Sequence, residues 1–509
     1  METFHLLIQG FGNALSFSNL FSSFLGCFVG TIIGILPGVG PSTTVALMIP
    51  IAFTIRPETA LIMMLGVYLG AMYGGTLTSV LLKVPGEASS VMTAIDGFEM
   101  AKQGKAGPAL AVSAIGSFIG GTLSVVALTF LAPIIASYAL AIGPAEFFSL
   151  LVAALIFASV LIGKDLLKGL VAVILGLLIA VAGIDLQTGV PRLTFGLSAL
   201  LEGISIIVII MGVFGVGEVF WFLAHKEKSS GERLAISGRL WPDKEDWHRS
   251  WPAILRGSAV GFFAGLLPGS GSSLGSIMAY TAEQRVSKEP ERFGKGAVEA
   301  VAAAETANNS ATGGALIPMI TLGIPGSGTT AVLLVVLMMY GLEPGPRLMI
   351  EQPQLMWTVV ASLYVSNVVL LCYNLPMIPL FLRILDIPVR YLMPMILAIA
   401  AVGAYALNNN FADLVLVFVF GALGYFMRAT NIPPVPMVLG AILGPRMEQS
   451  LRQALLLSNG DWMVFLRHPI STIFLMSGLV IVMWDIYSRL RKRKKTAANA
   501  NVSQEIKNE

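Results

Sequence analysis

Residues 30–44 read GTIIGILPGVGPSTT, and residues 261–273 repeat the pattern as GFFAGLLPGSGSS. The glycines, the proline and one serine of the two stretches match at a constant offset of 231 residues. A second Pro-Gly stretch follows in each half, LLKVPGEASS at 81–90 and TLGIPGSGTT at 321–330, at an offset of 240 residues. This recurrence of paired Pro-Gly stretches indicates that the chain is a duplication of one unit.

The composition places the duplicated unit in a membrane. Of the 509 residues, 55% are hydrophobic and 12% are charged, and the mean hydropathy is +0.80. A soluble protein carries about 25% charged residues, so this chain lacks the polar residues that a water-facing surface needs. We predict an all-α polytopic membrane protein of about 10–14 helical segments, several of which are broken or re-entrant at Pro-Gly because they fall short of a full span.

Several function classes are excluded by what the sequence lacks. The net charge of +3 offers no basic surface for nucleic acid. Cys27 and Cys372 both lie in apolar segments, so neither a disulfide framework nor a cysteine metal site is expected. No P-loop motif for nucleotide phosphates occurs. The apolar segments also lack a nucleophile with its base or a pair of aspartates, so we do not expect an enzyme.

Charge divides the chain into five segments. The head, residues 1–16, has no Lys or Arg, whereas the loop at 225–250 and the tail at 489–509 are rich in both. By the positive-inside rule the loop and the tail are cytoplasmic and the head is external. Residues 17–224 and 251–488 are then the two membrane repeats with their trailing spans, and the polar tail is predicted to be disordered. The repeats would enter the membrane from opposite sides, which is an inverted-topology duplication.

The Pro-Gly stretches predict a polar cavity. Pro and Gly inside a membrane free backbone groups from helix hydrogen bonding, and each such group needs another partner. Small hydroxyl residues follow each break, where helix N-termini can attract carboxylates. The candidate substrate-binding residues are Gly40, Ser42, Thr43, Thr44, Lys83, Gly86, Ser89, Ser90, Gly271, Ser272, Ser273, Gly326, Ser327, Thr329 and Thr330. The candidate ion-binding residues are Gly38, Gly269, Asn308 and Asn309, through carbonyl or amide oxygens.

Close packing is a plainer interpretation of part of this pattern. Gly30 and Gly34, like Gly261 and Gly265, have the GxxxG spacing that lets helices approach closely, and we favour packing as their role. Hydroxyl residues after a Pro-Gly break can also serve only as helix caps. Because the paired breaks recur in both halves, we favour a ligand or ion site for the breaks themselves.

The polar residues near the breaks leave alternatives open. Lys83 is either a functional intramembrane charge or a side chain that reaches the membrane interface. Asn308 and Asn309 either bind an ion or join helices by hydrogen bonds. For Glu305 we favour a charge that faces a loop, and for Asp96 a loop cap.

The same segments resemble the large membrane subunit of the tripartite tricarboxylate transporters, the TctA family. The stretches that carry the resemblance cover most of residues 20–350 and read GTIIGILPGVGPSTTVALMIPI, VPGEASSVMTAIDGFEMAKQGKAGPAL, ETANNSATGGALIPMITLGIPGSGTTAVLL and GLEPGPRL. The C-terminal third matches more loosely, through NNNFADLVLVFVFGALGYFMR.

The resemblance implies a secondary importer of di- or tricarboxylates in the bacterial inner membrane, with a periplasmic N-terminus and a cytoplasmic C-terminus. Such a subunit works in the lipid bilayer with a small TctB-like membrane subunit and a periplasmic TctC-like substrate-binding protein. A gradient of Na⁺ or H⁺ drives import, and no other cofactor is implied. Lys83 stands where the family more usually has a small polar residue such as Asn, which points to an anion other than citrate. Symmetric broken hairpins would also suit an elevator-type movement.

Two functions stay open from the sequence alone. An ion-coupled carboxylate importer would use the hydroxyl-rich breaks for substrate and the nearby carbonyls and amides for cations. An uncoupled facilitator or channel would use the same cavity and would show no dependence on a sodium or proton gradient.

Overall fold

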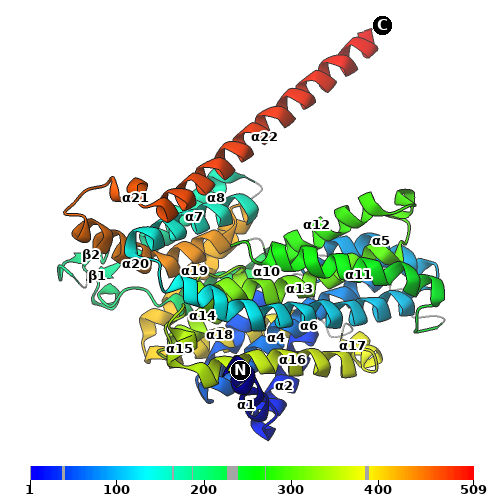
Figure 1. Ribbon diagram of the computed structural model, residues 1–509, viewed down its shortest axis with the longest axis horizontal. Coiled ribbons are helices and arrows are strands. Elements are labelled where there is room, and N and C mark those ends of the chain that lie inside the picture. Colours follow the sequence, from blue (N-terminus) through cyan, green and yellow to red (C-terminus); the bar gives the residue numbers. More distant parts are fainter. Residues whose placement is uncertain are drawn as a thin grey trace.

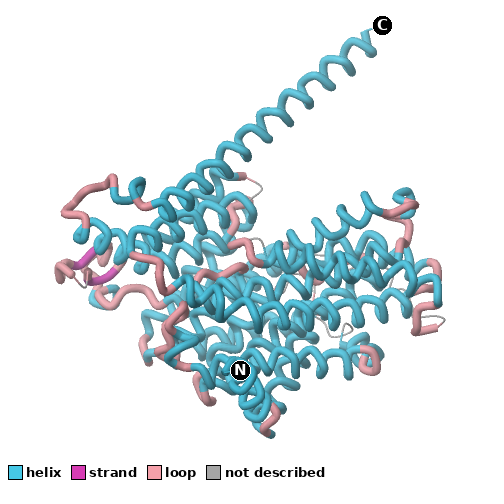
Figure 2. Tube along the Cα trace, in the orientation of Figure 1, coloured by secondary structure: helices cyan, strands magenta, loops and turns pink. Residues whose placement is uncertain are grey.

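The computed structural model describes residues 2–36, 40–162, 165–185, 187–225, 239–269, 271–384 and 389–508, and these residues are almost entirely helical (Figures 1 and 2). The longer helices are α1 (Glu2–Ala14), α2 (Phe17–Gly34), α3 (Pro41–Ala52), α4 (Pro57–Leu82), α5 (Val91–Lys102), α6 (Ala106–Ala139), α7 (Pro144–Ile162), α8 (Leu166–Val181), α10 (Gly217–Ala224), α11 (Lys244–Gly265), α12 (Gly271–Val286), α13 (Val298–Leu322), α14 (Gly328–Met339), α16 (Pro353–Asn374), α18 (Val389–Asn408), α19 (Phe411–Ala429), α20 (Pro434–Leu457) and α22 (Pro469–Asn508). The short elements are η1 (Ala88–Ser90), β1 (Gly183–Ile184), β2 (Pro191–Arg192), η2 (Ser198–Leu200), α9 (Ile206–Ile210), η3 (Met211–Val216), η4 (Pro290–Arg292), α15 (Leu348–Glu351), α17 (Ile378–Ile384) and α21 (Val464–Arg467), and the two strands pair antiparallel.

Eight of the described helical segments are long and apolar enough to cross a membrane. They are Phe17–Gly34, Pro57–Leu82, Ala106–Ala139, Pro144–Ile162, Ile206–Ala224, Pro353–Asn374, Phe411–Ala429 and Pro469–Arg489. The prediction of an all-α polytopic membrane protein is confirmed. The described helices outnumber the predicted segments, because hydropathy does not detect short or polar helices such as α12, α15 and α21.

Two helices, α4 and α13, form the interior. The apolar window of α4 is entirely buried, and α13 is buried along nearly its whole length despite its polar residues. Helix α13 packs between α11 and α6, as Figure 1 shows, while α4 packs against α2. Because protein surrounds α13, it can carry amides and carboxylates that lipid would not accept.

Glycines allow the closest of these helix contacts. A Cβ on Gly30 of α2 would lie 2.3 Å from the carbonyl oxygen of Val67 in α4, and a Cβ on Gly261 of α11 would lie 2.3 Å from that of Ala307 in α13. The close packing favoured for these glycines is therefore what the structure shows. The two contacts keep the offsets of the sequence repeat, 231 residues for the glycines and 240 for their partners. This agreement supports a duplication, whereas the opposite orientation of the halves stays a prediction.

The polar segments differ from the simple loops and tails that composition predicts. Residues 226–238 of the loop predicted at 225–250 lie outside the described residues, but its end already belongs to α11. Asp243 caps that helix, and the backbone N–H of Asp246 and the Arg239 guanidinium lower the pKa of Asp243 to about 2. The head is also helical, because residues Glu2–Ala14 form α1, and this helix packs against α16.

The tail predicted to be disordered at 489–509 continues α22 as far as Asn508. Figure 1 shows α22 projecting from the body of the protein. No Gly or Pro follows Gly478, so the sequence contains no residue that would end the helix.

The close glycine contacts make a direct prediction about folding. A Gly30→Ala substitution would push α2 away from α4, because its Cβ meets backbone and cannot be accommodated by a rotamer change. Overpacking of this kind costs about 1–3 kcal/mol, so the thermal midpoint of the purified protein in detergent should fall. Gly12→Ala is the matched control, since Gly12 is exposed in α1 and a Cβ there meets no atom within 4 Å. Equal midpoints for the two variants would contradict the contact.

Candidate functional site

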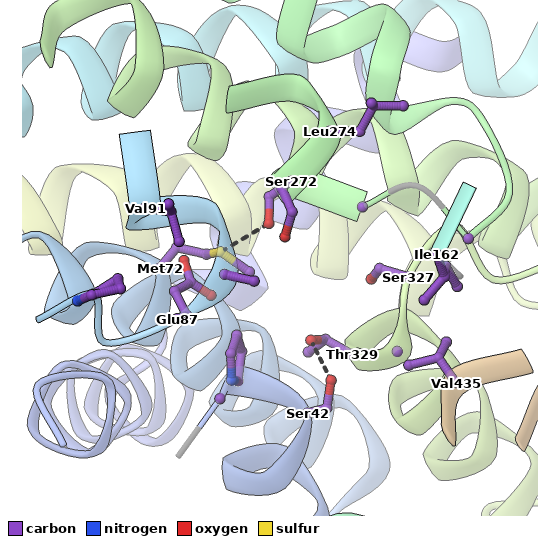
Figure 3. Close-up of a pocket in the computed structure, with 18 of the residues that line it drawn as sticks. Ser42, Met72, Glu87, Val91, Ile162, Ser272, Leu274, Ser327, Thr329 and Val435 are labelled. Carbon is purple, nitrogen blue, oxygen red and sulfur yellow. Dashed lines mark hydrogen bonds between the residues drawn. The ribbon is translucent and has the colours of Figure 1, made fainter. Parts of the chain in front are cut away.

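The starts of several helices meet at one cavity of about 620 Å³. Helices α3, α12 and α14 each begin at its wall, and the Pro-Gly turn that leads into η1 completes it (Figure 3). Of the predicted site residues, the cavity brings together Gly40, Ser42, Gly86, Gly269, Gly271, Ser272, Ser273, Ser327 and Thr329. Residues from both halves of the chain therefore line a single polar site.

The hydroxyl groups at these helix starts connect the two halves. Ser42 and Thr329 are joined by a hydrogen bond of 3.0 Å between their hydroxyl oxygens. Within the second half, the backbone N–H of Gly271 donates to the carbonyl of Gly326 at 3.2 Å, so the two breaks of that half are also in contact. Ser272 Oγ lies 3.5 Å from the sulfur of Met72, a residue of α4 in the first half, as the dashed line in Figure 3 marks. The first break of one half thus lies beside the second break of the other.

Three hydroxyl residues of the first half that were predicted to bind substrate instead form hydrogen bonds with backbone groups. Thr43 donates to the carbonyl of Phe214 at 2.8 Å, and Thr44 donates to that of Gly40 at 3.1 Å. Ser90 accepts from the backbone N–H of Glu87 at 3.4 Å and closes a capping box.

The remaining predicted residues around the second breaks also have structural roles. Ser89 donates to the carboxylate of Glu87, which itself lines the cavity. Thr330 closes a capping box with Ser327 at the start of α14. A Cβ on Gly326 would lie 2.9 Å from Ala315, so glycine is needed there for close approach. None of these three residues is among those that line the cavity in the described part of the chain.

Lys83 does not reach the cavity. It ends α4 in the left-handed conformation with φ 58°, at the position where Gly323 ends α13 with φ 69°. Its side chain is 55% exposed, its Nζ lies 3.5 Å from Glu99 Oε1, and it also lies over the Phe98 ring. The side chain is directed to α5, so the alternative of an outward-reaching lysine fits the structure and a substrate contact does not.

The two asparagines diverge. Asn308 Nδ2 donates to Glu87 Oε1 at 3.3 Å, whereas Asn309 Nδ2 donates to Ser117 Oγ of α6 at 2.7 Å. Adjacent residues of an α-helix point about 100° apart, so the pair does not share one ligand. Asn309 joins two helices, while Asn308 faces the cavity wall. Gly38, predicted to bind an ion, lies outside the described residues.

The sequence analysis missed or misjudged two carboxylates, one on the cavity wall and one buried in α13. Glu87 lines the cavity, and its only signal in the sequence is its place directly after Pro85 and Gly86. Glu305 was expected to face a loop, and this expectation is wrong. It is fully buried in the middle of α13, where it accepts hydrogen bonds from Thr76 at 2.7 Å and Thr93 at 2.5 Å.

Arg428 is a second residue that the sequence analysis missed. Among the described residues that line the cavity, it is the one cation and Glu87 is the one carboxylate. Arg428 pairs with Glu218 and lies 4.5 Å from the centre of the Trp221 ring. It also lines a neighbouring cavity of about 370 Å³. An arginine at the end of an apolar helix is typical of a membrane-interface anchor, so its sequence gives no signal for a cavity.

Asp96 holds the frame of the site, as its predicted role of loop cap requires. It is fully buried and accepts from Tyr280 Oη at 2.8 Å. It also accepts from the backbone N–H groups of Gly294, Gly296 and Ala297, at 2.8–3.0 Å. These bonds fasten α5 to the connection that enters α13.

Comparison with known proteins agrees with this architecture. The family model described as "Tripartite tricarboxylate transporter TctA family" matches residues 20–439. An uncharacterized 52.8 kDa protein in the TAR-I ttuC' 3' region of Agrobacterium vitis is 41% identical over 455 residues, which cover 89% of this chain and 90% of that protein. An uncharacterized protein in the TAR-II ttuC' 3' region of Agrobacterium vitis is 40% identical over 234 residues, which cover 46% of this chain and 97% of that protein. No solved structure matches the chain. The chain therefore belongs to the tripartite tricarboxylate transporter TctA family, a family of transporter subunits and not of enzymes.

Proposed function

We propose that this protein is the large membrane subunit of an ion-gradient-driven importer of di- or tricarboxylates in a bacterial inner membrane. The observation that carries the proposal is the convergence of the starts of α3, α12 and α14 on one cavity with hydroxyl groups on its wall. A small membrane subunit and a periplasmic binding protein complete the system, as family membership implies. The inverted repeat and an elevator-type movement belong to the same proposal.

The cavity suits an anion with more than one carboxylate. A helix N-terminus carries roughly half a positive charge and unpaired N–H groups that favour negative ligands. Three helix starts at separate points of one wall can therefore meet separate carboxylates of one substrate. Ser42, Ser272, Ser273 and Thr329 add hydroxyl donors to the same wall.

Charge favours a coupled importer over an uncoupled facilitator. Each negative charge that enters against an inside-negative potential of 100 mV costs about 2.3 kcal/mol. A dicarboxylate therefore meets about 4.6 kcal/mol, and an uncoupled path would exclude it about a thousandfold. The cavity side chains do not offset this charge, since Arg428 and Glu87 have opposite signs. Cations that enter with the substrate remove the opposition.

The test of the proposed function is uptake of a labelled carboxylate panel by cells that express this chain with its candidate small subunit. Each uptake is measured with and without a candidate periplasmic binding protein, and with the sodium and proton gradients collapsed separately. Accumulation that needs the binding protein and one gradient is the expected result. Equilibration that ignores both gradients would make the protein a facilitator.

Gly40→Leu is predicted to block the cavity without unfolding the protein. Gly40 has φ −74°, which any residue adopts, and a Cβ there meets no atom within 4 Å. A leucine would occupy space at the cavity wall, and a loss of even about 1.4 kcal/mol of substrate binding lowers affinity tenfold. Uptake should fall about tenfold or more at unchanged abundance and thermal midpoint.

Gly12→Leu is the matched control, since Gly12 is exposed on α1 and equally free of contacts. Gly86→Leu is less informative, because a Cβ there would lie 2.4 Å from the carbonyl of Gly34 and disturb the fold. Normal uptake by the Gly40→Leu variant would place the substrate elsewhere.

Thiol labelling should separate the cavity wall from the residues behind it. In a background with Cys27→Ser and Cys372→Ser, a Ser273→Cys variant should react with a membrane-impermeant thiol reagent, because Ser273 lines the cavity and is part exposed. A transported carboxylate should slow that reaction. A Thr43→Cys variant should stay unlabelled, since Thr43 is buried against Phe214. Equal labelling of both variants would contradict the assignment of the wall.

A further inference from the structure

The two halves build one frame, and the cavity wall differs between them in its charge. Glu87 and Ser327 lie 240 residues apart, and each caps the helix that follows its Pro-Gly break. Ser90 and Thr330 complete the two capping boxes. Since serine performs this capping role in the second half, the frame does not require a carboxylate at position 87.

The two halves also differ in the residue that contacts this capping side chain. Tyr68 and Asn308 occupy equivalent positions, 240 residues apart, on α4 and α13. Tyr68 Oη lies 3.5 Å from Ser327 Oγ, and Asn308 Nδ2 lies 3.3 Å from Glu87 Oε1. One contact pairs a phenol with a hydroxyl, whereas the other pairs an amide with a carboxylate. Glu305, one helical turn before Asn308, likewise stands where the first half has Leu65.

Both carboxylates have neutral partners. Glu87 accepts from Ser89 and Asn308, and Glu305 accepts from Thr76 and Thr93. Among the described residues, no ion pair involves either carboxylate. A carboxylate taken out of water without a countercharge costs several kcal/mol even after relaxation, and neutral donors offset only part of that cost. The fully buried Glu305, together with Glu87 on the part-exposed cavity wall, therefore favours a cation that the two share.

An orphaned oxygen lies beside them. Asn308 is fully buried, and its Nδ2 is directed to Glu87 and to the carbonyl of Met72, at 3.3 Å and 3.4 Å. Its Oδ1 has no hydrogen-bond partner among the described residues. A buried amide oxygen without a hydrogen-bond partner can bind a cation through its lone pairs. This unpartnered oxygen is a second observation that points to a cation, separate from the two carboxylates.

We propose that Glu87, Asn308 and Glu305 form the site of the coupling cation, and that Glu87 is the wall shared by this site and the carboxylate cavity. The inference rests on the proposed function. The cation, H⁺ or Na⁺, neutralises the only described carboxylate that lines the cavity. With Glu87 neutralised, the described charge that remains on the cavity wall is that of Arg428. By linkage the substrate tightens cation binding in return. This reciprocal effect on binding is what couples transport of the substrate to transport of the cation.

Other titratable groups lie around the pair. The charges of Glu87 and Glu305 act on Tyr68 and Tyr73 of α4, respectively, and the charge of Glu305 acts on Glu87. Arg428 lies on the wall of the same cavity but pairs with Glu218 on its own side. Cation dependence of substrate binding therefore reports on the two carboxylates.

The test compares the wild-type protein with Glu87→Gln, which keeps the side-chain shape and makes position 87 permanently neutral. Binding of the carboxylate identified by the uptake panel is measured with sodium replaced by choline, and in a separate pH series without sodium. In the wild type, sodium or a falling pH should raise affinity, since coupled sites change each other about 5- to 150-fold. In the variant, that dependence should shrink to less than about twofold.

Transport gives the second measurement. The Glu87→Gln variant in proteoliposomes should still exchange labelled for unlabelled carboxylate but should no longer accumulate it on a cation gradient. Glu99→Gln is the control, since Glu99 pairs with Lys102 at 3.0 Å, outside the cavity. If Glu87→Gln lowers the thermal midpoint, Glu87→Ser replaces it, because serine is the residue that caps the equivalent helix.

The outcomes are distinct. Sodium dependence that the variant loses assigns Na⁺ to the site, and pH dependence that it loses assigns H⁺. Full cation dependence and normal accumulation in the variant would overturn the site while leaving a coupled importer. A wild-type protein that shows no cation dependence and no accumulation would overturn the proposed function itself.

Discussion

Backbone groups inside a bilayer have to be paired, and the rest of this structure follows from how the chain satisfies them where its helices stop. Helices α4 and α13 end in the same way, with a left-handed residue at Lys83 or Gly323. The N–H of the next residue then turns back to a carbonyl in the last turn, Val84 to Thr78 and Ile324 to Pro318. A capping box starts the following helix in each half. The cavity is the space in which these helix starts face one another.

Close helix packing makes such stops possible. Glycines bring α2 against α4, and α11 against α13, at backbone contact distance, so that the central helices are enclosed by protein. Enclosure lets α13 carry Glu305 and Asn308 without exposing them to lipid. The cross-connection of Ser42 to Thr329 then makes each wall of the cavity a product of both halves. The close helix contacts, the buried polar residues of α13 and the cavity shared by both halves therefore depend on the same packing of the central helices.

The sequence predicted the parts of this arrangement that are local. Pro-Gly breaks, hydroxyl caps and glycine spacing are patterns of neighbouring residues, and nine of the predicted substrate- or ion-binding residues line one cavity. It failed where distant segments decide the surroundings. In sequence Glu305 resembles a loop charge, and only the fold brings Thr76 of α4 and Thr93 of α5 to it. Arg428 resembles an interface anchor, and only the fold brings it to the cavity that the starts of α3 and α14 also line. The prediction for Lys83 failed for a different reason, because its side chain, at the left-handed end of α4, lies against Glu99 and Phe98 of α5 and not in the cavity.

The buried Asp96 carries a consequence for the making of the protein. The N–H groups that donate to its carboxylate belong to Gly294, Gly296 and Ala297, which follow Asp96 in the chain by 198 to 201 positions. When only the first half has been synthesised, that carboxylate still lacks these N–H groups and the Tyr280 hydroxyl, since all of them belong to the second half. Asp96 therefore reaches its buried and fully paired state only when the second half packs against the first. The second repeat thus completes the packing of the first, and the hydrogen bonds of a single side chain join the two halves of this duplicated chain.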